Sequence, residues 1–236
     1  MIIEERIIYL EKYIQRLCKD EVFPGAYYGI ITEDEIYSNY LGNSQVVPTV
    51  EKVGENTLYD LASLTKVIST TTAIMILIER GYLTLDTLVS DVLPRYKNKG
   101  VKIKHLLTHT SGHDADIDCK KMNKEELINE VYNSKINPNT FEKGVLYSDI
   151  GYILLGFIIE ELAGSLENFV QETIFKPLDM KKTFYNPDEK YVNYCATTEY
   201  CTMRDKMIKG IVHDEKAYVL GGVAGHAGLF SNVEDI

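Results

Sequence analysis

Residues 63–81 read SLTKVISTTTAIMILIERG, and this stretch decides how the chain folds. It is apolar nearly all round and ends at Gly81, a residue that suits the C-terminal cap of a helix. The pattern predicts one long helix that begins near Ser63. Because such a helix has no wide polar face, we expect it to lie buried in the middle of the protein.

The first turn of this helix carries a candidate nucleophile. Ser63 and Lys66 lie three residues apart, so they share a helix face and the Lys66 amine can reach the Ser63 hydroxyl. A serine hydroxyl attacks well only when a base removes its proton, and a lysine desolvated at the start of an apolar helix can be that base. The free N–H groups of the helix N-terminus would face an acyl oxyanion. The same spacing also fits an N-cap serine followed by a solvated lysine.

A second candidate motif is Tyr147-Ser148-Asp149, which immediately precedes the apolar helix expected over residues 151–163. A short polar turn that leads into such a helix can be pinned against a rigid scaffold, as catalytic loops are. The alternative is a tyrosine half-buried at a helix start, with no role in chemistry.

Other segments predict the layout around these motifs. An amphipathic helix is expected over residues 3–18, a hairpin over 26–43, and helices over 124–132, 151–163 and 165–175. Apolar helices enclosed by one chain indicate a helical lobe inserted in an α/β lobe. We therefore expect one α+β domain over residues 1–236 with an antiparallel sheet. Its N-terminal hairpin would occupy about 23–62, and the mostly helical lobe with the catalytic Ser and Tyr motifs about 63–180.

Composition excludes some partners and favours one compartment. The formal net charge of −10 disfavours nucleic acid and anionic membrane surfaces. The longest apolar run, residues 73–78, is too short to span a bilayer, and the N-terminus does not resemble a signal peptide. The sequence as given is therefore expected to stay in the cytoplasm. The cysteines, which form no C-x-x-C pair, are expected to be free thiols; they are Cys18, Cys119, Cys195 and Cys201.

Five segments, in one order along the chain, resemble a known superfamily. They are TLYDLASLTKVIST (57–70), LLTHTSG (106–112), YSDIGYILLG (147–156), KPLDMKKTFY (176–185) and GHAGLFSNVEDI (225–236). Together they resemble the superfamily of class C β-lactamases, D,D-carboxypeptidases and related esterases. Residues 210–230 look most like a subgroup of penicillin-binding proteins or D-alanyl-D-alanine carboxypeptidases. The resemblance implies a β-lactamase/transpeptidase-like fold that needs neither a metal nor another cofactor.

The resemblance also implies roles for single residues. Ser63 would be the acylated nucleophile, Lys66 its proton-handling partner, and Tyr147 the shuttle to the leaving group. Asp149, where the family often has Asn, would face the substrate amide. An acid there should favour the ammonium form of Lys66 by charge attraction, which favours Tyr147 as the base, although the choice of base stays open. The implied substrate is a small molecule or peptide: a D-alanyl peptide, a β-lactam or a small ester.

A third family motif, K-T-G or H-x-G on a strand, is expected to be missing. His226-Ala227-Gly228 fits H-x-G, but its surroundings resemble a segment that lies before that motif. Ser231 and Glu234 also form a capping-box pattern with only two residues after it. We therefore expect a chain truncated at the C-terminus, with strands and a partner segment missing.

Two other functions compete with the serine hydrolase. A truncated homologue without the third motif could be catalytically impaired. A metal-dependent hydrolase could use histidines, which are His105, His109, His113, His213 and His226. The first three recur every four residues, but Ser111-Gly112 interrupts that series and no H-E-x-x-H motif exists.

Overall fold

The structure is a computed structural model that describes residues 4–236. The chain divides into two compact units, and each contains segments that are far apart in the sequence. The first unit contains the chain up to Asp60 together with Pro187–Gly210 and Phe230–Ile236. The second unit contains Leu61–Asn186 and Ile211–Leu229. The single domain with lobes at about 23–62 and 63–180 stays a prediction.

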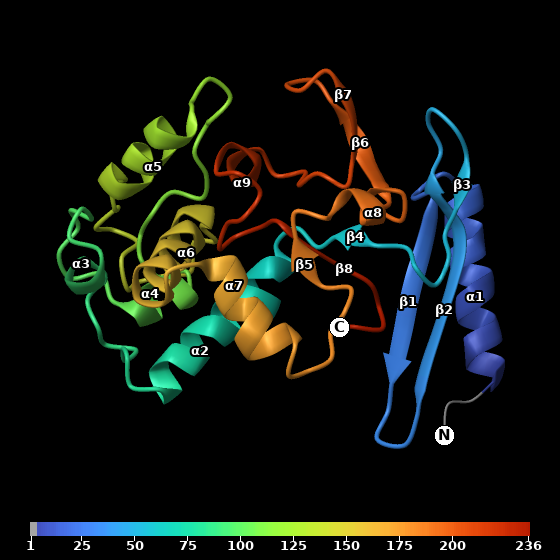
Figure 1. Cartoon of the computed structure of the whole chain (residues 1–236), viewed down its shortest axis with the longest axis horizontal. Coiled ribbons are helices and arrows are strands. Elements are labelled where there is room, and N and C mark those ends of the chain that lie inside the picture. Colours follow the sequence, from blue (N-terminus) through green and yellow to red (C-terminus); the bar gives the residue numbers. More distant parts are fainter. Residues whose placement is uncertain (1–3) are drawn as a thin grey trace. The chain divides into compact units, whose positions relative to one another are not determined.

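The first unit begins with a helix and a hairpin (Figure 1). Helix α1 spans Glu4–Lys19, and strands β1 (Gly25–Ile31), β2 (Ile36–Gln45) and β3 (Glu51–Lys52) form an antiparallel sheet in the order β1-β2-β3. The predicted helix and hairpin are confirmed, although the predicted start at Ile3 lies outside the described residues. Glu11 joins α1 to the sheet, since its carboxylate accepts hydrogen bonds from Tyr37 at 2.8 Å and Asn39 at 2.6 Å.

Short strands complete the first unit. Its remaining elements are β4 (Tyr59–Asp60), α8 (Glu189–Val192), β6 (Thr197–Cys201) and β7 (Lys206–Lys209), with β6 and β7 antiparallel. Strand β8, Leu229–Ser231, pairs antiparallel with β4. After β8, the Asn232 side chain accepts a hydrogen bond from the Asp235 N–H at 3.1 Å, so a turn and not a helix follows the strand.

The second unit is mostly helical and packs around α6. Helix α6 spans Asp149–Ala163, with nine buried residues, and packs against α3, α4, α5, α7 and η1 (Figure 1). The predicted helices over 124–132, 151–163 and 165–175 are confirmed. The elements around α6 are η1 (Lys66–Thr71), α2 (Thr72–Glu79), α3 (Val89–Val92), α4 (Ile103–Leu107), α5 (Lys124–Asn133), α7 (Leu166–Val170), η2 (Gln171–Phe175), β5 (Phe184–Tyr185) and α9 (Glu215–Val219).

The helix expected over 63–81 is present, but the prediction that it is buried all round is wrong. Ile74 and Leu77 lie in the core, whereas Val67 is 56% exposed and Met75 61%. Single apolar side chains are common at protein surfaces, so an apolar run does not by itself require burial on every side. The first part, η1, is a π-helix, a wider turn that is frequent at functional sites.

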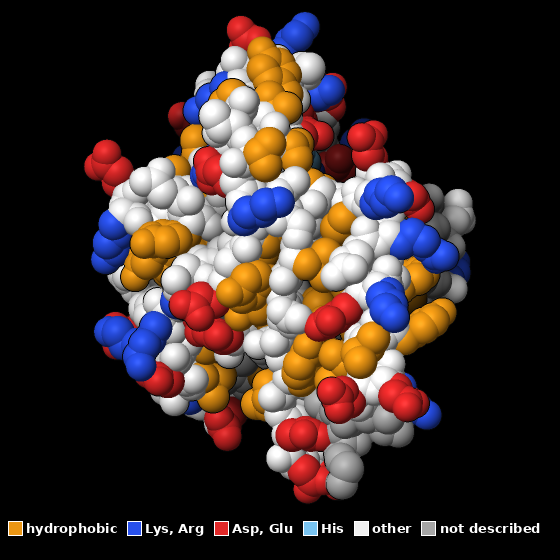
Figure 2. Space-filling view, turned by 90° about the vertical axis from the view of Figure 1, so that its right-hand side faces the viewer, with side chains coloured by type: hydrophobic (Ala, Val, Ile, Leu, Met, Phe, Trp, Pro, Cys, Tyr) orange, Lys and Arg blue, Asp and Glu red, His pale blue; other side chains and the backbone are white. Residues whose placement is uncertain are grey.

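Three features bear on the predictions from composition: the length of apolar helices, the surface charge and the thiols. No helix within residues 4–236 is long and apolar enough to cross a membrane. The face in Figure 2 has lysines and arginines interspersed with aspartates and glutamates. The four cysteines are free thiols, as predicted.

The buried imidazole of His113 should make stability depend on pH. Its Nε2 lies 2.9 Å from the Tyr96 hydroxyl and its Nδ1 2.8 Å from the Ser111 hydroxyl. Burial lowers the pKa of His113 to about 4, below the value of about 6.5 for an unfolded chain. The neutral ring therefore stabilises the fold fully above about pH 6.5, and this contribution, roughly 3 kcal/mol, is lost as the pH falls towards 4.

We predict that the free energy of unfolding in urea decreases between pH 7 and pH 4.5. In His113→Gln this decrease should be smaller, because the variant lacks the imidazole that takes up about one proton on unfolding in this pH range. An NMR titration that shows His113 gaining its proton near pH 6.5 in the folded protein would contradict the prediction.

Candidate functional site

Ser63 and Lys66 are in direct contact at the start of η1. The Lys66 Nζ lies 2.9 Å from the Ser63 Oγ. Ser63 is exposed and reachable by a substrate, whereas Lys66 is only 3% exposed. The preceding residue, Ala62, has a φ of +45°, a backbone conformation that is costly for a residue with a Cβ. The chain therefore turns sharply where it presents the Ser63 hydroxyl.

Three acceptors surround the Lys66 amine. Besides the Ser63 Oγ, it donates to Asp149 Oδ1 at 2.8 Å and to the His226 carbonyl oxygen at 3.1 Å. An ammonium group has three N–H donors and no acceptor, so these contacts match the charged form of Lys66. In that form Lys66 donates a hydrogen bond to Ser63 and is not available to take its proton.

Tyr147 also lies beside Lys66. The Lys66 Nζ is 4.8 Å from the centre of the Tyr147 ring, a cation–π contact, and the Tyr147 side chain is half-exposed. The Tyr147 ring also lies 4.5 Å from the His109 ring, centre to centre. The structure thus brings together the four residues predicted from the sequence, although residues 63 and 66 lie far along the chain from 147 and 149.

The turn before α6 is held by several hydrogen bonds. The Ser148 hydroxyl donates to the Asp114 carbonyl at 2.6 Å and caps α6 by accepting from the Gly151 N–H. The Ser148 N–H donates to His109 Nδ1 at 3.1 Å. Burial, and then the Lys66 charge, lower the pKa of His109, which keeps this nitrogen an acceptor at neutral pH. These bonds fix the orientation of Tyr147 and Asp149.

A second group of charged residues extends from Asp149. The Lys216 Nζ lies 3.3 Å from Asp149 Oδ2, 3.3 Å from Asp214 Oδ2 and 2.7 Å from Asp116 Oδ1. Asp214 Oδ1 in turn accepts from His226 Nε2 at 2.7 Å and from the Ala217 N–H at the start of α9. None of these roles was predicted: the sequence indicates His226 only as an H-x-G match or a metal ligand, Asp214 lies in a matching segment, and no local motif identifies Lys216.

The electrostatics of this group favour charged carboxylates. Burial alone would raise the pKa of Asp149, but attraction by His226 and the hydrogen bond and charge of Lys66, together with Lys216, lower it below its usual value. Asp214 behaves alike, since the His226 hydrogen bond and Lys216 outweigh its burial. Both carboxylates are therefore ionised at neutral pH and act only as hydrogen-bond acceptors.

Metal ligation by the histidine series is not favoured by the geometry. His105 Nδ1 accepts from the Lys102 N–H, His109 stacks on Tyr147, and His113 is held by Tyr96 and Ser111. Within residues 4–236, the group whose ligand atoms converge is Asp149, Asp214 and His226, with all atoms within 4.8 Å of one another. The Lys216 ammonium already lies 3.3 Å from both carboxylates, so it supplies the cation that they would otherwise attract.

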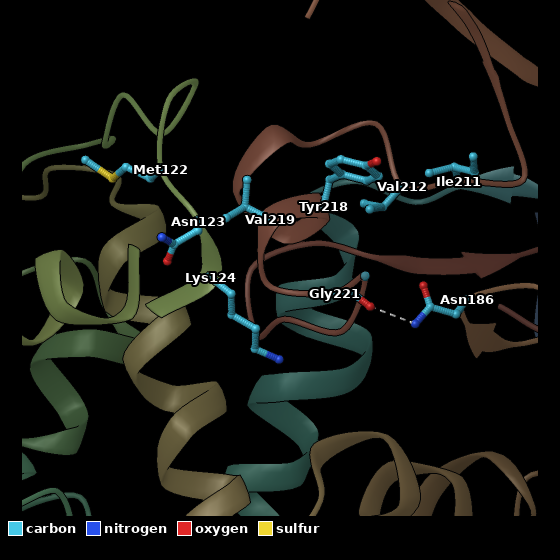
Figure 3. A pocket seen from close by; sticks show the side chains of 10 residues that line it. Met122, Asn123, Lys124, Asn186, Ile211, Val212, Tyr218, Val219 and Gly221 are labelled. Atoms are coloured by element: carbon cyan, nitrogen blue, oxygen red, sulfur yellow. Dashed lines mark hydrogen bonds between the residues drawn. The ribbon is translucent and has the colours of Figure 1, made fainter. Parts of the chain in front are cut away.

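A pocket in the second unit lies apart from this group. It is formed between the start of α5, at Lys124, and the end of α9, at Tyr218 and Val219 (Figure 3). The Asn186 side chain donates to the Gly221 carbonyl at 3.0 Å beside it. Of the ten described residues that line it, none is a predicted catalytic residue.

Comparison with known proteins decides the family. The family described as Beta-lactamase matches residues 10–236, nearly the whole chain. The chain belongs to the β-lactamase family. A Bacillus subtilis (strain 168) relative, named N-acetylmuramyl-L-alanine amidase, is 34% identical over 91% of this chain and 57% of its own length. A Salmonella agona (strain SL483) relative, with the provisional name D-alanyl-D-alanine carboxypeptidase, is 38% identical over 77% of this chain and 49% of its own.

Solved structures agree on the β-lactamase fold. A class C β-lactamase superposes with a TM-score of 0.81 at 23% identity, covering 99% of this chain and 64% of that chain. The octameric penicillin-binding protein homologue from Pyrococcus abyssi superposes with a TM-score of 0.75 at 24% identity, covering 97% and 54%. The predicted fold class, mixed helices and antiparallel sheet of the β-lactamase/transpeptidase type, is confirmed. The chain spans about half of the length of the curated relatives that it matches.

Close backbone packing places the His226 carbonyl on Lys66. A Cβ at Gly225 would lie 2.1 Å from the Tyr152 carbonyl oxygen and 2.8 Å from the Gly156 nitrogen, so only glycine fits against α6 here. The Gly225 carbonyl in turn accepts from the Thr70 hydroxyl at 2.7 Å. The glycine-rich segment, residues 221–228, therefore packs closely against η1 and α6 immediately before His226.

We predict that Gly225→Ala destabilises the protein by about 1–3 kcal/mol, the usual cost of overpacking a rigid interior, because the new methyl group meets backbone atoms. Chemical unfolding would measure this loss. Gly144→Ala is the matched control, since a Cβ there meets nothing within 4 Å. Equal stabilities of the two variants would contradict the proposed packing.

Proposed function

We propose that the protein is a serine hydrolase that forms an acyl-enzyme on Ser63. The observation that carries this proposal is the 2.9 Å contact between the exposed Ser63 hydroxyl and the buried Lys66 amine, with the Tyr147 ring beside the same amine. This arrangement combines a nucleophile, a fixed positive charge and a phenol that can exchange protons. The names of the amidase and carboxypeptidase relatives support it.

In the first step, the phenolate form of Tyr147 takes the Ser63 proton while the Ser63 Oγ bonds to the substrate carbonyl carbon. The Lys66 ammonium stabilises the negative charge on the Tyr147 and Ser63 oxygens and does not itself give up a proton. The tetrahedral adduct then breaks its bond to the leaving nitrogen or oxygen, which takes the proton from Tyr147. Water then attacks the acyl-enzyme and gives a proton to Tyr147. Tyr147 passes a proton to the Ser63 oxygen as that oxygen leaves.

Asp149 favours amides among the candidate substrates. Its ionised carboxylate can only accept hydrogen bonds, so it can contact a substrate N–H but not a substrate carbonyl. A D-alanyl or other peptide amide offers that N–H, whereas a simple ester does not. We therefore place peptide amides and β-lactams with an amide side chain ahead of small esters. The absence of the third motif, K-T-G or H-x-G, stays a prediction.

Covalent labelling tests the nucleophile. We predict that a fluorescent penicillin or a fluorophosphonate attaches to Ser63, as located by mass spectrometry of the labelled peptide. Ser63→Ala should abolish the label, and a metal chelator should leave its rate unchanged. Labelling of Ser63→Ala at the wild-type rate would contradict Ser63 as the nucleophile. No labelling of the wild type would instead support a catalytically impaired homologue.

Replacement of Tyr147 tests the base. Tyr147→Phe should slow labelling by about 10²–10⁴-fold, the usual contribution of a general base, because Lys66 in its charged form does not replace it. Tyr132→Phe is the control, since Tyr132 stacks on Phe157 elsewhere in the second unit. If Tyr147→Phe labels as fast as this control, Tyr147 is not the base.

A further inference from the structure

The contacts around Lys66 close into a ring. Lys66 binds Asp149 Oδ1, and Asp149 Oδ2 lies 3.3 Å from Lys216. Lys216 lies 3.3 Å from Asp214, whose other oxygen accepts from His226 Nε2. The His226 carbonyl oxygen returns to Lys66 at 3.1 Å. Two of the three acceptors that hold the Lys66 ammonium are therefore themselves held, directly or through Asp214, by Lys216.

We propose that Lys216 is a positioning residue of this active site, which fixes Asp149 and His226 and so sets the orientation of the Lys66 ammonium toward Ser63. The inference rests on the proposed function for its effect on catalysis. Lys216 contacts Asp116, Asp149 and Asp214, and it acts on the nucleophile only through these partners and Lys66.

The division of Asp149 between two lysines supports this role. One carboxylate oxygen faces Lys66 and the other faces Lys216, so the carboxylate plane is fixed from both sides. The Lys216 side chain is only 8% exposed, and water cannot easily replace it. Without Lys216, Asp149 Oδ2 would lose its charged partner, and the carboxylate could rotate away from Lys66.

The charge balance gives a second reason. Three carboxylates, Asp116, Asp149 and Asp214, face two ammonium groups, Lys66 and Lys216. Removal of Lys216 would leave two partly buried carboxylates, Asp149 and Asp214, and the exposed Asp116 near one ammonium group, Lys66. Such a change would favour protonation of Asp149, which weakens its hold on Lys66. Two histidines also lie near Asp149: His226, on the glycine-rich segment, and His109, two residues after the end of α4.

Two variants of Lys216 test the inference through the pH dependence of Ser63 labelling. Lys216→Met should slow labelling at pH 7 by about a hundredfold, as expected for a misplaced catalytic group. The acid limb, which is the fall in labelling rate as the pH decreases, should move to higher pH. Lys216→Arg keeps the charge and should restore most of the rate. Lys176→Met removes an exposed lysine that pairs with Glu172 and should change neither quantity.

Asp116→Asn provides a variant that keeps Lys216 and should fold, because the Asp116 side chain is 66% exposed. It removes one negative charge near Lys216 and Asp149, so Asp149 should hold its charge to lower pH and the acid limb should move down. Opposite shifts in Lys216→Met and Asp116→Asn are expected only if this cluster controls the Lys66 environment. An unchanged acid limb in both variants would overturn the inference.

A carboxyl carbon NMR titration separates this inference from the proposed function. Asp149, assigned with Asp149→Asn, should gain its proton at higher pH in Lys216→Met and at lower pH in Asp116→Asn. If these shifts occur but Ser63 is never labelled, the hydrolase proposal fails while the positioning of Asp149 by Lys216 stands. If Asp149 titrates alike in all variants, the inference about Lys216 fails whatever the labelling shows.

Discussion

The buried ammonium of Lys66 is the constraint on which the second unit depends. A charge removed from water is costly unless each of its donors has a partner, and a partner of opposite charge reduces that cost further. Lys66 finds its acceptors at Ser63, Asp149 and the His226 backbone, which lie far apart in the sequence. The fold must therefore bring η1, the start of α6 and the glycine-rich segment to one point. Much of the local structure serves that requirement.

The turn before α6 and the glycine-rich segment contact Lys66 in different ways. The turn before α6 is fixed by the Ser148 hydrogen bonds, which orient a charged side chain. The glycine-rich segment instead offers a backbone carbonyl, and it comes close enough because Gly225 has no side chain to meet α6. A backbone carbonyl cannot be titrated, whereas Asp149 can. The site thus combines one permanent acceptor with one whose strength depends on its charged neighbours.

The sequence allowed the helices, the first hairpin and four site residues to be predicted, because each follows from local spacing or an ordered set of motifs. Apolar periodicity identifies α6, and serine and lysine three residues apart identify Ser63 and Lys66. Lys216 could not be found in this way, since a buried lysine and a surface lysine look alike until their partners are known. The exposed side of α2 was missed for a related reason: apolar residues do not reveal which of them face solvent.

The presence of Asp rather than Asn at position 149 links the charge network to the base that we propose. The ionised carboxylate places an opposite charge 2.8 Å from the Lys66 amine, which a neutral amide would not. A carboxylate alone would in turn be costly to bury, and Lys216 offsets that cost from its other side. The acid at position 149 and the lysine at 216 thus support each other. In the proposed mechanism, Lys66 is then a fixed charge and Tyr147 is the group that exchanges a proton with Ser63.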